Sequence, residues 1–312
     1  MADVRAVALE LEDTFELPPQ RGLWSDALHR LMQNRLALVS LFVLGALAVV
    51  VLLGNYVDAV QRYEPSALGD ALPAGRHEAP SWDHFFGTDI LGRDTWSRVM
   101  QGTLISLQIG LGVQVVVLTI GLLVGSIAAI GGRFLDNLMM RITDLAYAFP
   151  DLLFIILLRS VLQGRDWPIL GDPVLQMIFA IAFVGWVTIA RLIRGQMLSL
   201  RERDFVVAAR AIGAPGWRIV FQHMLPNTLG PVTVAVVFGI PLAIFAEAVL
   251  GFIGFGLPPP TASLGRLVSD GYNYIQVNVW LVIFPAGAIA LLMLCFTFLG
   301  DGLRDALDPR SR

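Results

Sequence analysis

The chain has 312 residues, of which 56% are hydrophobic and only 15% are charged, and its net charge is -3. A mean hydropathy of +0.69 lies far above the range of soluble proteins, so the sequence is that of an integral membrane protein. With an isoelectric point near 5.8, the chain offers no basic field to a nucleic acid, and nucleic-acid partners are excluded.

All 22 basic residues are arginine, because the sequence contains no lysine. A Gly-x-x-x-x-Gly-Lys-Ser/Thr phosphate loop and Schiff-base catalysis both need a lysine amine, so this chain has neither. The single cysteine, Cys295, lies in an apolar run and is expected to be a small core residue. Since no zinc-protease, C-x-x-C or nucleophile-elbow pattern is present either, we expect no catalytic residue, metal site or bound cofactor.

In chain order, a cytoplasmic N-terminal tail at residues 1–29 comes first, and the acidic residues and Pro18-Pro19 within residues 1 to about 23 predict that this part is mobile. Six apolar runs then follow that are long enough to cross about 30 Å of hydrocarbon. They lie at about 36–56, 103–131, 136–158, 174–194, 228–250 and 280–300. The sequence therefore predicts an all-α polytopic membrane protein with six transmembrane helices, the third interrupted by Arg141, Asp144 and Pro150.

These runs divide the chain into a first helix with an outer loop (30–102), a core of five helices (103–300) and a C-terminal tail (301–312). Arginine placement predicts the orientation. With both termini inside, 15 of the 22 arginines lie in cytoplasmic segments. This orientation also puts the loop 195–227 in the cytoplasm.

The outer loop ends in the string Phe86-Gly87-Thr88-Asp89-Ile90-Leu91-Gly92-Arg93-Asp94-Thr95-Trp96-Ser97-Arg98. Thr88 or Asp89 can cap the following helix. The pairs Asp89/Arg93 and Asp94/Arg98 stand four residues apart, the spacing of ion pairs on a helix. Helix capping and control of the entry angle are favoured here over contact with a substrate.

Ionisable residues inside membrane spans are costly and commonly face a bundle interior or a water-filled path. Arg141 and Asp144 are three residues apart on one helical face, which favours mutual pairing over contact with a substrate. Arg159 is expected to extend to the outer interface. Glu247, near the outer end of the fifth span, is a candidate to close a gate, to pair with an arginine of a partner subunit, or to contact water.

Two glutamines of the second span, Gln108 and Gln114, are further candidates for lining a translocation path. Hydrogen bonds between helices are the alternative role for these side chains. Gly121 and Gly125 in the same span have the small-x-x-x-small spacing of closely packed membrane helices.

The segment from Arg203 to Gly213 predicts a short basic helix. Its narrow apolar stripe consists of Phe205, Ala208, Ala209 and Ile212. Gly213 supplies the left-handed residue that ends a helix, and Pro215 suits the first turn of the next one. A second short helix through Trp217 to Met224 is then predicted to stop at Pro226.

With Ala208-Ala209, Gly213 and Leu225-Pro226, this loop resembles the cytoplasmic EAA loop of inner-membrane permease subunits of ABC-type importers. Val207 replaces the Glu of that motif. The resemblance implies a coupling helix that docks into a groove of a separate ATPase subunit. The implied docking residues are Asp204, Phe205, Ala208, Ala209, Arg210, Ile212, Gly213 and Ala214.

The outer-loop string, the segment Glu247–Gly256 with Pro258-Pro259-Pro260, and the C-terminal Leu299–Pro309 resemble the dipeptide/oligopeptide branch of that family. The resemblance implies the type I ABC importer permease fold, with the first helix a peripheral addition. It also implies a bacterial inner-membrane location, a homologous second permease, an extracytoplasmic substrate-binding protein, and two ATP-binding subunits that hold ATP and Mg.

Peptides are the cargo that the resemblance implies, and nickel, opines, glutathione or sugars are the alternatives carried on similar permeases. A stand-alone channel or ion-coupled transporter is the rival from another class. It needs a charged relay deep in the bundle, for which Asp144 alone offers little.

Overall fold

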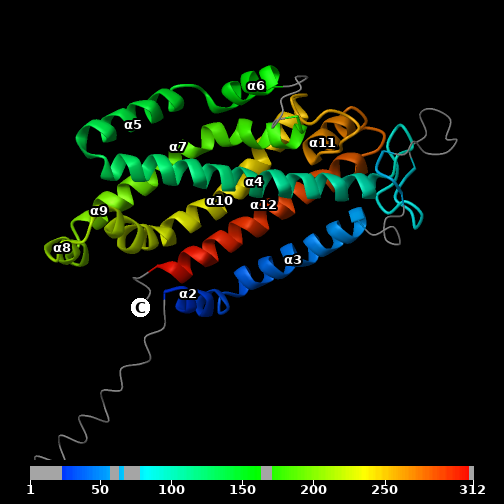
Figure 1. Cartoon of the computed structure of the whole chain (residues 1–312). Helices are drawn as coiled ribbons and strands as arrows, with labels where there is room; N and C mark the ends of the chain where they lie inside the picture. The colour runs from blue at the N-terminus through cyan, green and yellow to red at the C-terminus, as the bar shows by residue number, and fades with distance from the viewer. Residues whose placement is uncertain (1–22, 57–62, 67–77, 163–170, 309–312) are drawn as a thin grey trace, which may run out of the picture.

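The structure, a computed structural model, describes residues 23–56, 63–66, 78–162 and 171–308 (Figure 1). These ranges fold into α2 (Leu23–Leu31), α3 (Arg35–Tyr56), α4 (Thr95–Ile130), α5 (Gly132–Tyr147), α6 (Asp151–Leu162), α7 (Pro173–Arg201), α8 (Asp204–Ala211), α9 (Gly216–Arg218), a π-helical stretch η1 (Ile219–Met224), α10 (Leu225–Phe252), α11 (Leu264–Tyr272) and α12 (Trp280–Leu307). The described part contains no strand beyond an isolated bridge between Thr88 and Asp94. The all-α prediction is confirmed.

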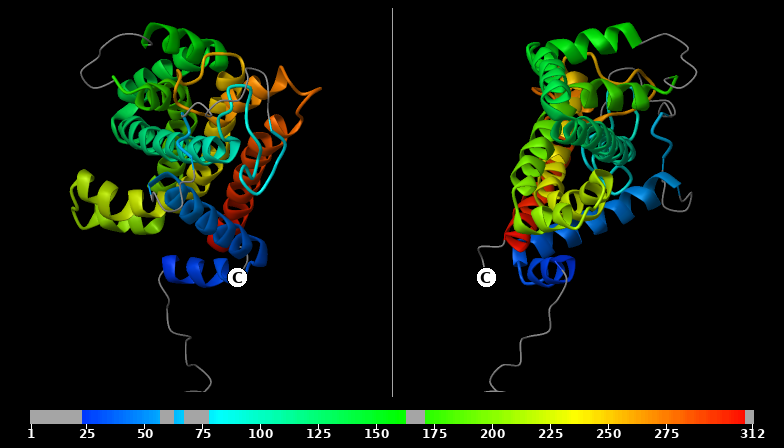
Figure 2. Two further views of the ribbon diagram at one scale, coloured as in Figure 1. Left: turned by 90° about the vertical axis from the view of Figure 1, so that its right-hand side faces the viewer. Right: turned by 60° about the vertical axis from the view of Figure 1, so that its left-hand side comes forward.

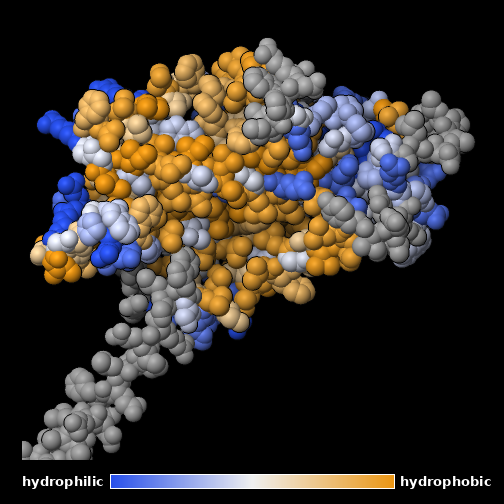
Figure 3. Space-filling view, in the orientation of Figure 1, coloured by the Kyte–Doolittle hydropathy of each residue, from blue (hydrophilic) through white to orange (hydrophobic). Residues whose placement is uncertain are grey.

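Five helices of the described part are long and apolar enough to cross a membrane: α3, α4, α7, α12 and the continuous helix formed by α9, η1 and α10. The pair α5 and α6 passes the same test only as a unit. Counted as one span, this pair brings the total to the six that the sequence predicts. The chain is a polytopic membrane protein, and the space-filling view shows a broad hydrophobic band between hydrophilic ends (Figure 3).

The third predicted span, 136–158, is not one straight helix, because α5 and α6 meet at 85°. Pro150 stands at the break. It has no backbone N–H to donate, and its ring disfavours helical geometry at the preceding residue. The carbonyl of Pro150 instead accepts from the N–H of Phe154 at 3.0 Å and so begins α6.

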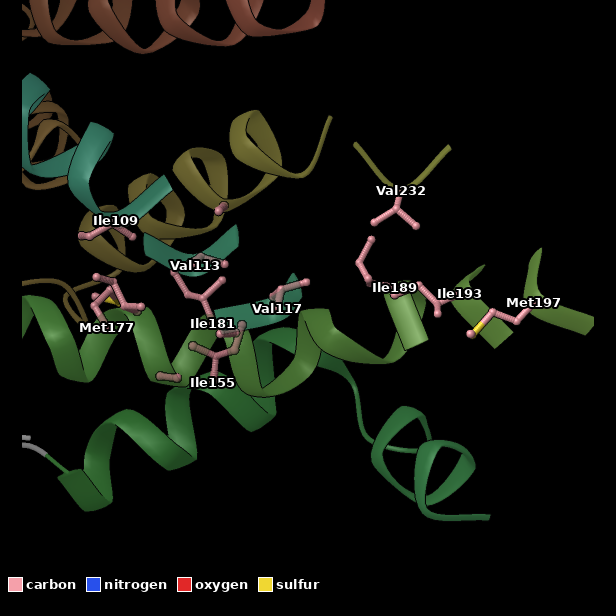
Figure 4. Close-up of a cluster of buried hydrophobic side chains, with 14 of the residues drawn as sticks. Ile109, Val113, Val117, Ile155, Met177, Ile181, Ile189, Ile193, Met197 and Val232 are labelled. Carbon is pink, nitrogen blue, oxygen red and sulfur yellow. The ribbon is translucent and has the colours of Figure 1, made fainter. Parts of the chain in front are cut away.

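The centre of the fold is the pairing of α4 with α7 (Figure 1). Gly125 makes this close approach possible, because a Cβ at that position would lie 2.6 Å from the carbonyl oxygen of Ala190. Figure 4 shows the apolar cluster of this core, in which Val113, Ile181 and Ile155 come together from α4, α7 and α6. The small-residue spacing of α4 thus does serve close packing.

The first span is peripheral: only 17% of its most apolar window is buried, compared with 56% in α7. It packs mainly on α12, and α2 lies beside the start of α3 (Figure 2). The predicted mobile tail lies at residues 1–22, outside the described residues, and α2 begins directly after it at Leu23. Cys295 is buried and unpaired on α12, as predicted for a core residue.

The bundle has two distinct ends (Figure 1). The end that carries α8 and α9 also holds α2 and the last turns of α12, and we call it the α8 end. The opposite end carries α11 and residues 78–94, and we call it the α11 end. Both ends of the described chain therefore lie on the same side as the predicted coupling helix.

Candidate functional site

A sharp corner separates α7 from α8 at the α8 end. Arg203 has the extended backbone of a helix N-cap (φ -77°, ψ 146°), and Asp204 in the first turn complements the positive end of the helix dipole. The eight residues Asp204–Ala211 form α8, as the sequence predicts. A short helix is thereby held beyond the end of the long α7.

Gly213 ends this helix in the predicted left-handed conformation, with φ +80°. The N–H of Ala214 donates to the carbonyl of Ala209 at 3.0 Å, and the N–H of Gly213 donates to that of Arg210 at 2.9 Å. These two bonds form a Schellman motif, which satisfies the last carbonyls of a helix. The turn fixes the direction in which the chain leaves α8.

The apolar stripe predicted for α8 divides between two faces. Phe205, Ala208 and Ile212 are exposed, and Ile212 has 85% of its surface accessible. Ala209 is buried, together with Val206, in the main hydrophobic core. The prediction that Ala209 contacts a partner is therefore wrong for this structure, because its face of α8 packs on the chain's own core.

The helix after the corner adds further exposed apolar side chains, Trp217 and Phe221. The predicted stop at Pro226 is wrong, since α10 continues directly from η1 through that residue. A proline is tolerated in the first turn of a helix, where its missing N–H leaves no gap. We call the exposed apolar side chains of this region the corner surface: Phe205, Val207, Ala208, Ile212, Trp217 and Phe221.

Two ion pairs join α5 to the half of α7 that leads into the corner. Arg194 donates to both carboxylate oxygens of Asp136, with its Nη2 2.6 Å from Oδ2. Arg191 donates to Asp144 at 2.9 Å and lies over the ring of Tyr147. The predicted pairing of Asp144 with Arg141 is thus wrong: α7 supplies a better-placed arginine.

Arg141 is exposed and makes no ion pair within the described ranges. Asp136 and Arg194 were not among the residues predicted from the sequence, although each stands at a polar position of an otherwise apolar run. Their separation of 58 residues explains the omission, because nothing local indicates that they meet. The broken third span is thereby tied to the helix that carries α8.

A groove of about 420 Å³ lies between α4, α5, α6, α7 and α10. Gln114 lines it from α4, and Thr188 and Asp151 supply further polar groups to a mostly apolar wall. Gln108, two turns nearer the α11 end, is exposed on the surface of α4. The structure therefore brings Gln114, and not Gln108, to the wall of a groove that has other polar groups.

Glu247 has no accessible surface in this chain. One carboxylate oxygen accepts a hydrogen bond from Ser106 of α4 at 2.9 Å, across 141 residues of sequence. Contact with water and pairing with an arginine of another subunit, as predicted, are both incompatible with this position. A role as a gate remains a prediction that requires α4 and α10 to separate.

Arg159 does not extend to an interface as predicted, since it too is fully buried. Its guanidinium donates to Oε1 of Gln176 at 2.6 Å and to the carbonyl oxygen of Gly256 at 3.2 Å. These contacts tie α6 to the start of α7 and to the loop after α10. Arg159 therefore has an internal structural role in holding the α11 ends of these segments together.

At the α11 end, Asp94 caps α4: its carboxylate accepts from the N–H of Ser97 at 2.8 Å. The cap predicted at Thr88 or Asp89 is thus displaced to Asp94. The pair Asp89/Arg93 forms as predicted, but Arg98 also turns to Asp89, because Asp94 is already occupied by the cap and by His84.

Comparison with protein families shows that the chain is similar to membrane transport components. Residues 121–312 match the model of the binding-protein-dependent transport system inner membrane component. Residues 22–70 match the N-terminal transmembrane domain of oligopeptide transport permease C. The first match begins within α4 and extends through α12, and the second includes the peripheral α2–α3 pair.

Two relatives from Bacillus subtilis illustrate the similarity over nearly the full length. The oligopeptide transport system permease protein OppC is 40% identical over 291 residues, which cover 93% of this chain and 91% of the relative. The dipeptide transport system permease protein DppC is 39% identical, with coverage of 94% and 88%.

Solved structures share the fold at lower sequence identity. The MetNI methionine ABC transporter in an inward-facing conformation matches with a TM-score of 0.54 and 20% identity, covering 67% of this chain and 96% of the solved chain. An amino acid ABC transporter crystallised with histidines matches with a TM-score of 0.52 and 16% identity, covering 66% and 92%.

Proposed function

Because the chain belongs to the family of binding-protein-dependent transport system inner membrane components, we propose that it is the peptide-specific permease subunit of an ATP-driven importer. It forms half of the translocation path and pairs with a homologous second permease. Two ATP-binding subunits, which hold ATP and Mg, act from the cytoplasm, and an extracytoplasmic binding protein delivers the cargo. This chain binds no cofactor of its own.

The observation that carries this proposal is the corner surface. Exposed residues such as Ile212 and Trp217 are large and apolar, yet they stand at a polar end of the bundle. Exposed apolar side chains gathered beyond the hydrophobic band mark a site where another protein binds. The ATP-binding subunit is the occupant we propose.

The structure suggests how force on α8 reaches the membrane part. Val206 and Ala209 join α8 to the main core, and the ion pairs from Arg191 and Arg194 extend this unit to α5. In the proposed cycle, ATP-driven closure of the ATP-binding subunits moves α8, and α5, α7 and α10 move with it. The path then opens outward, and hydrolysis reverses the change, which requires different binding energies in the two states.

The α8 end is proposed to face the cytoplasm of a bacterial cell, with both termini on that side of the inner membrane. The described ends of the chain lie at the α8 end, and 15 of the 22 arginines fall in segments that the sequence predicts to be cytoplasmic. This orientation puts the corner surface where ATP-binding subunits can reach it.

Peptide cargo is proposed from the relatives, which are named as oligopeptide and dipeptide permeases. The test is reconstitution of the chain with its second permease, ATP-binding subunits and binding protein in lipid vesicles. We expect ATP-dependent accumulation of a labelled di- or tripeptide that stops when any partner is omitted. Accumulation of nickel, an opine, glutathione or a sugar, with no peptide uptake, would correct the cargo alone, whereas flux without ATP and partners would overturn the importer.

A further inference from the structure

The α11 end contains a cavity of about 380 Å³, a size in the range of ligand sites. Its walls come from the loop before α4, the start of α4, the loop after α10, and α11 and α12. Apolar side chains such as Ile90, Leu267 and Leu281 form one part of the lining. Charged side chains form the other: Asp89, Arg93, Arg98, Arg266 and Asp270.

The Asp89 side of this cavity is saturated with hydrogen bonds. Oδ1 of Asp89 accepts from the backbone N–H groups of Leu91 and Arg93, both at 2.9 Å. Oδ2 accepts from Nε of Arg93 at 2.7 Å and from Nη1 of Arg98 at 2.5 Å. This carboxylate therefore has no capacity left for the other donors of the cavity.

At the Asp270 side of the cavity, hydrogen-bond donors lack close acceptors. Oδ2 of Asp270 lies 3.8 Å from Nη2 of Arg98 and 3.9 Å from Nε of Arg266, so neither contact is a hydrogen bond. Arg98 is only 3% exposed, and its Nε has no hydrogen-bond partner within the described ranges. A buried donor left without an acceptor is costly. Nη1 of Arg98 is bonded to Asp89, but Nη2 of Arg98 and Nε of Arg266 both face the distant carboxylate of Asp270.

This surplus of donors indicates an acceptor with two oxygens and a negative charge. We propose that the cavity receives the carboxylate of an Asp or Glu side chain from the extracytoplasmic substrate-binding protein, bound between Arg98 and Arg266. The planar guanidinium fork suits a carboxylate, and the apolar wall suits the methylene stem that carries it. This inference rests on the proposed function, which puts the α11 end on the side of the membrane that a binding protein can reach.

The position of the two arginines makes entry possible without unfolding. Arg266 and Asp270 have 37% and 44% of their side chains exposed at the mouth, whereas Arg98 is buried. An entering carboxylate meets Arg266 first and takes up the unused donors that Asp270 does not reach. Since Arg98 belongs to α4 and Arg266 to α11, the bound carboxylate would join these two helices.

The absence of lysine from the chain allows a direct test. The substitution Arg266→Lys places the chain's sole ε-amine at the cavity mouth, and Asp270→Asn in the same chain removes the neighbouring carboxylate that would compete for it. Treatment of the reconstituted complex with a carbodiimide, which joins an amine to a carboxylate in direct contact, should link residue 266 to one acidic residue of the binding protein. Mass spectrometry then identifies that residue.

The matched control is Arg304→Lys, an exposed site at the opposite end of the bundle. It should give no link to the binding protein. If residue 266 forms no such link while the binding protein still stimulates the ATPase of this variant, the inference is overturned. A complex in which no binding protein stimulates ATP hydrolysis, even with the unchanged chain, would instead overturn the proposed function.

A second measurement uses Arg266→Ala in nanodiscs. Loss of a charged hydrogen bond should raise the binding-protein concentration needed for half-maximal ATPase stimulation about 10-fold or more. Arg304→Ala should leave that concentration unchanged. If the effect of Arg266→Ala appears with anionic phospholipid and vanishes in phosphatidylcholine alone, the bound anion is a lipid headgroup and the inference is wrong.

Discussion

The two ends of the bundle differ in which side chains are exposed and which are buried. At the α8 end, large apolar side chains such as Ile212 and Phe221 are left exposed, and only Val206 and Ala209 fasten α8 to the core. At the α11 end, charged side chains such as Asp89 and Arg98 are buried and joined in a network. The first end thus leaves apolar surface free for the partner that we propose, and the second depends on interactions inside the chain.

This contrast implies different outcomes for substitutions at the two ends. Changes in the buried network should lower the stability of the chain itself. Changes at exposed residues of the corner should leave stability nearly unchanged and act on assembly. Stability and assembly are measured separately, so the expectation for each end of the bundle can be contradicted independently.

The largest effect is expected from Asp89→Asn. This change leaves the buried guanidinium of Arg98 without its close partner, and breaking a buried pair costs about 3–5 kcal/mol. Asp270→Asn is the control: its carboxylate is half-exposed and lies 3.8 Å or more from the arginines, so less than about 1 kcal/mol is expected. Thermal unfolding in detergent measures both, and equal loss would contradict the account of the network.

A smaller effect is expected from Gly213→Val, which forces a β-branched residue into a left-handed conformation at a cost of about 1–3 kcal/mol. No heavy atom of a neighbouring residue lies within 4 Å of the position that a Cβ would take, so the penalty comes from the backbone alone. Asparagine adopts this conformation more readily, so Gly213→Asn should retain most of the ATP-driven transport.

The measurement for Gly213 is ATP-driven transport by the reconstituted complex, compared with the midpoint of thermal unfolding. Transport should fall for the Val variant while the midpoint changes by a few degrees at most. Equal impairment by Val and Asn would mean that the left-handed turn has no part in coupling.

The smallest effect is expected from Val207→Glu, which restores the acidic residue of the EAA motif. Val207 is 52% exposed on α8, so the charge stays in water and should change stability by less than about 0.5 kcal/mol. Co-purification with the ATP-binding subunits should persist. Loss of assembly in this variant would show that docking requires an apolar residue at this position.

Local signals in the sequence predicted the local structure of the α8 end correctly. The helix at 204–211 and its end at Gly213 follow from periodicity and from the left-handed preference of glycine, which act over a few residues. The stop at Pro226 failed because the same residue type is compatible with the first turn of a helix. Whether the proline ends one helix or stands in the first turn of the next depends on the packing of η1 and α10.

Contacts between distant parts of the chain could not be predicted from the sequence. Whether Ala208 or Ala209 faces the core depends on where α7 and η1 lie. The apolar pattern of α8 includes both alanines and does not distinguish them. Asp136 meets Arg194 across 58 residues, and Ser106 meets Glu247 across 141. Hydropathy identified the polar residues inside the spans but not their partners.

The central claim is that the exposed face of α8 binds an ATP-binding subunit while its buried face holds the helix in place. The neighbouring variants Ala208→Glu and Ala209→Glu test it most directly, since one adds the charge to an exposed position of α8 and the other adds it to a buried position. We predict that Ala208→Glu abolishes co-purification with the ATP-binding subunits at unchanged thermal stability, whereas Ala209→Glu also lowers that stability, because it buries an unpaired carboxylate. Retained co-purification and transport in the Ala208→Glu complex would contradict the claim.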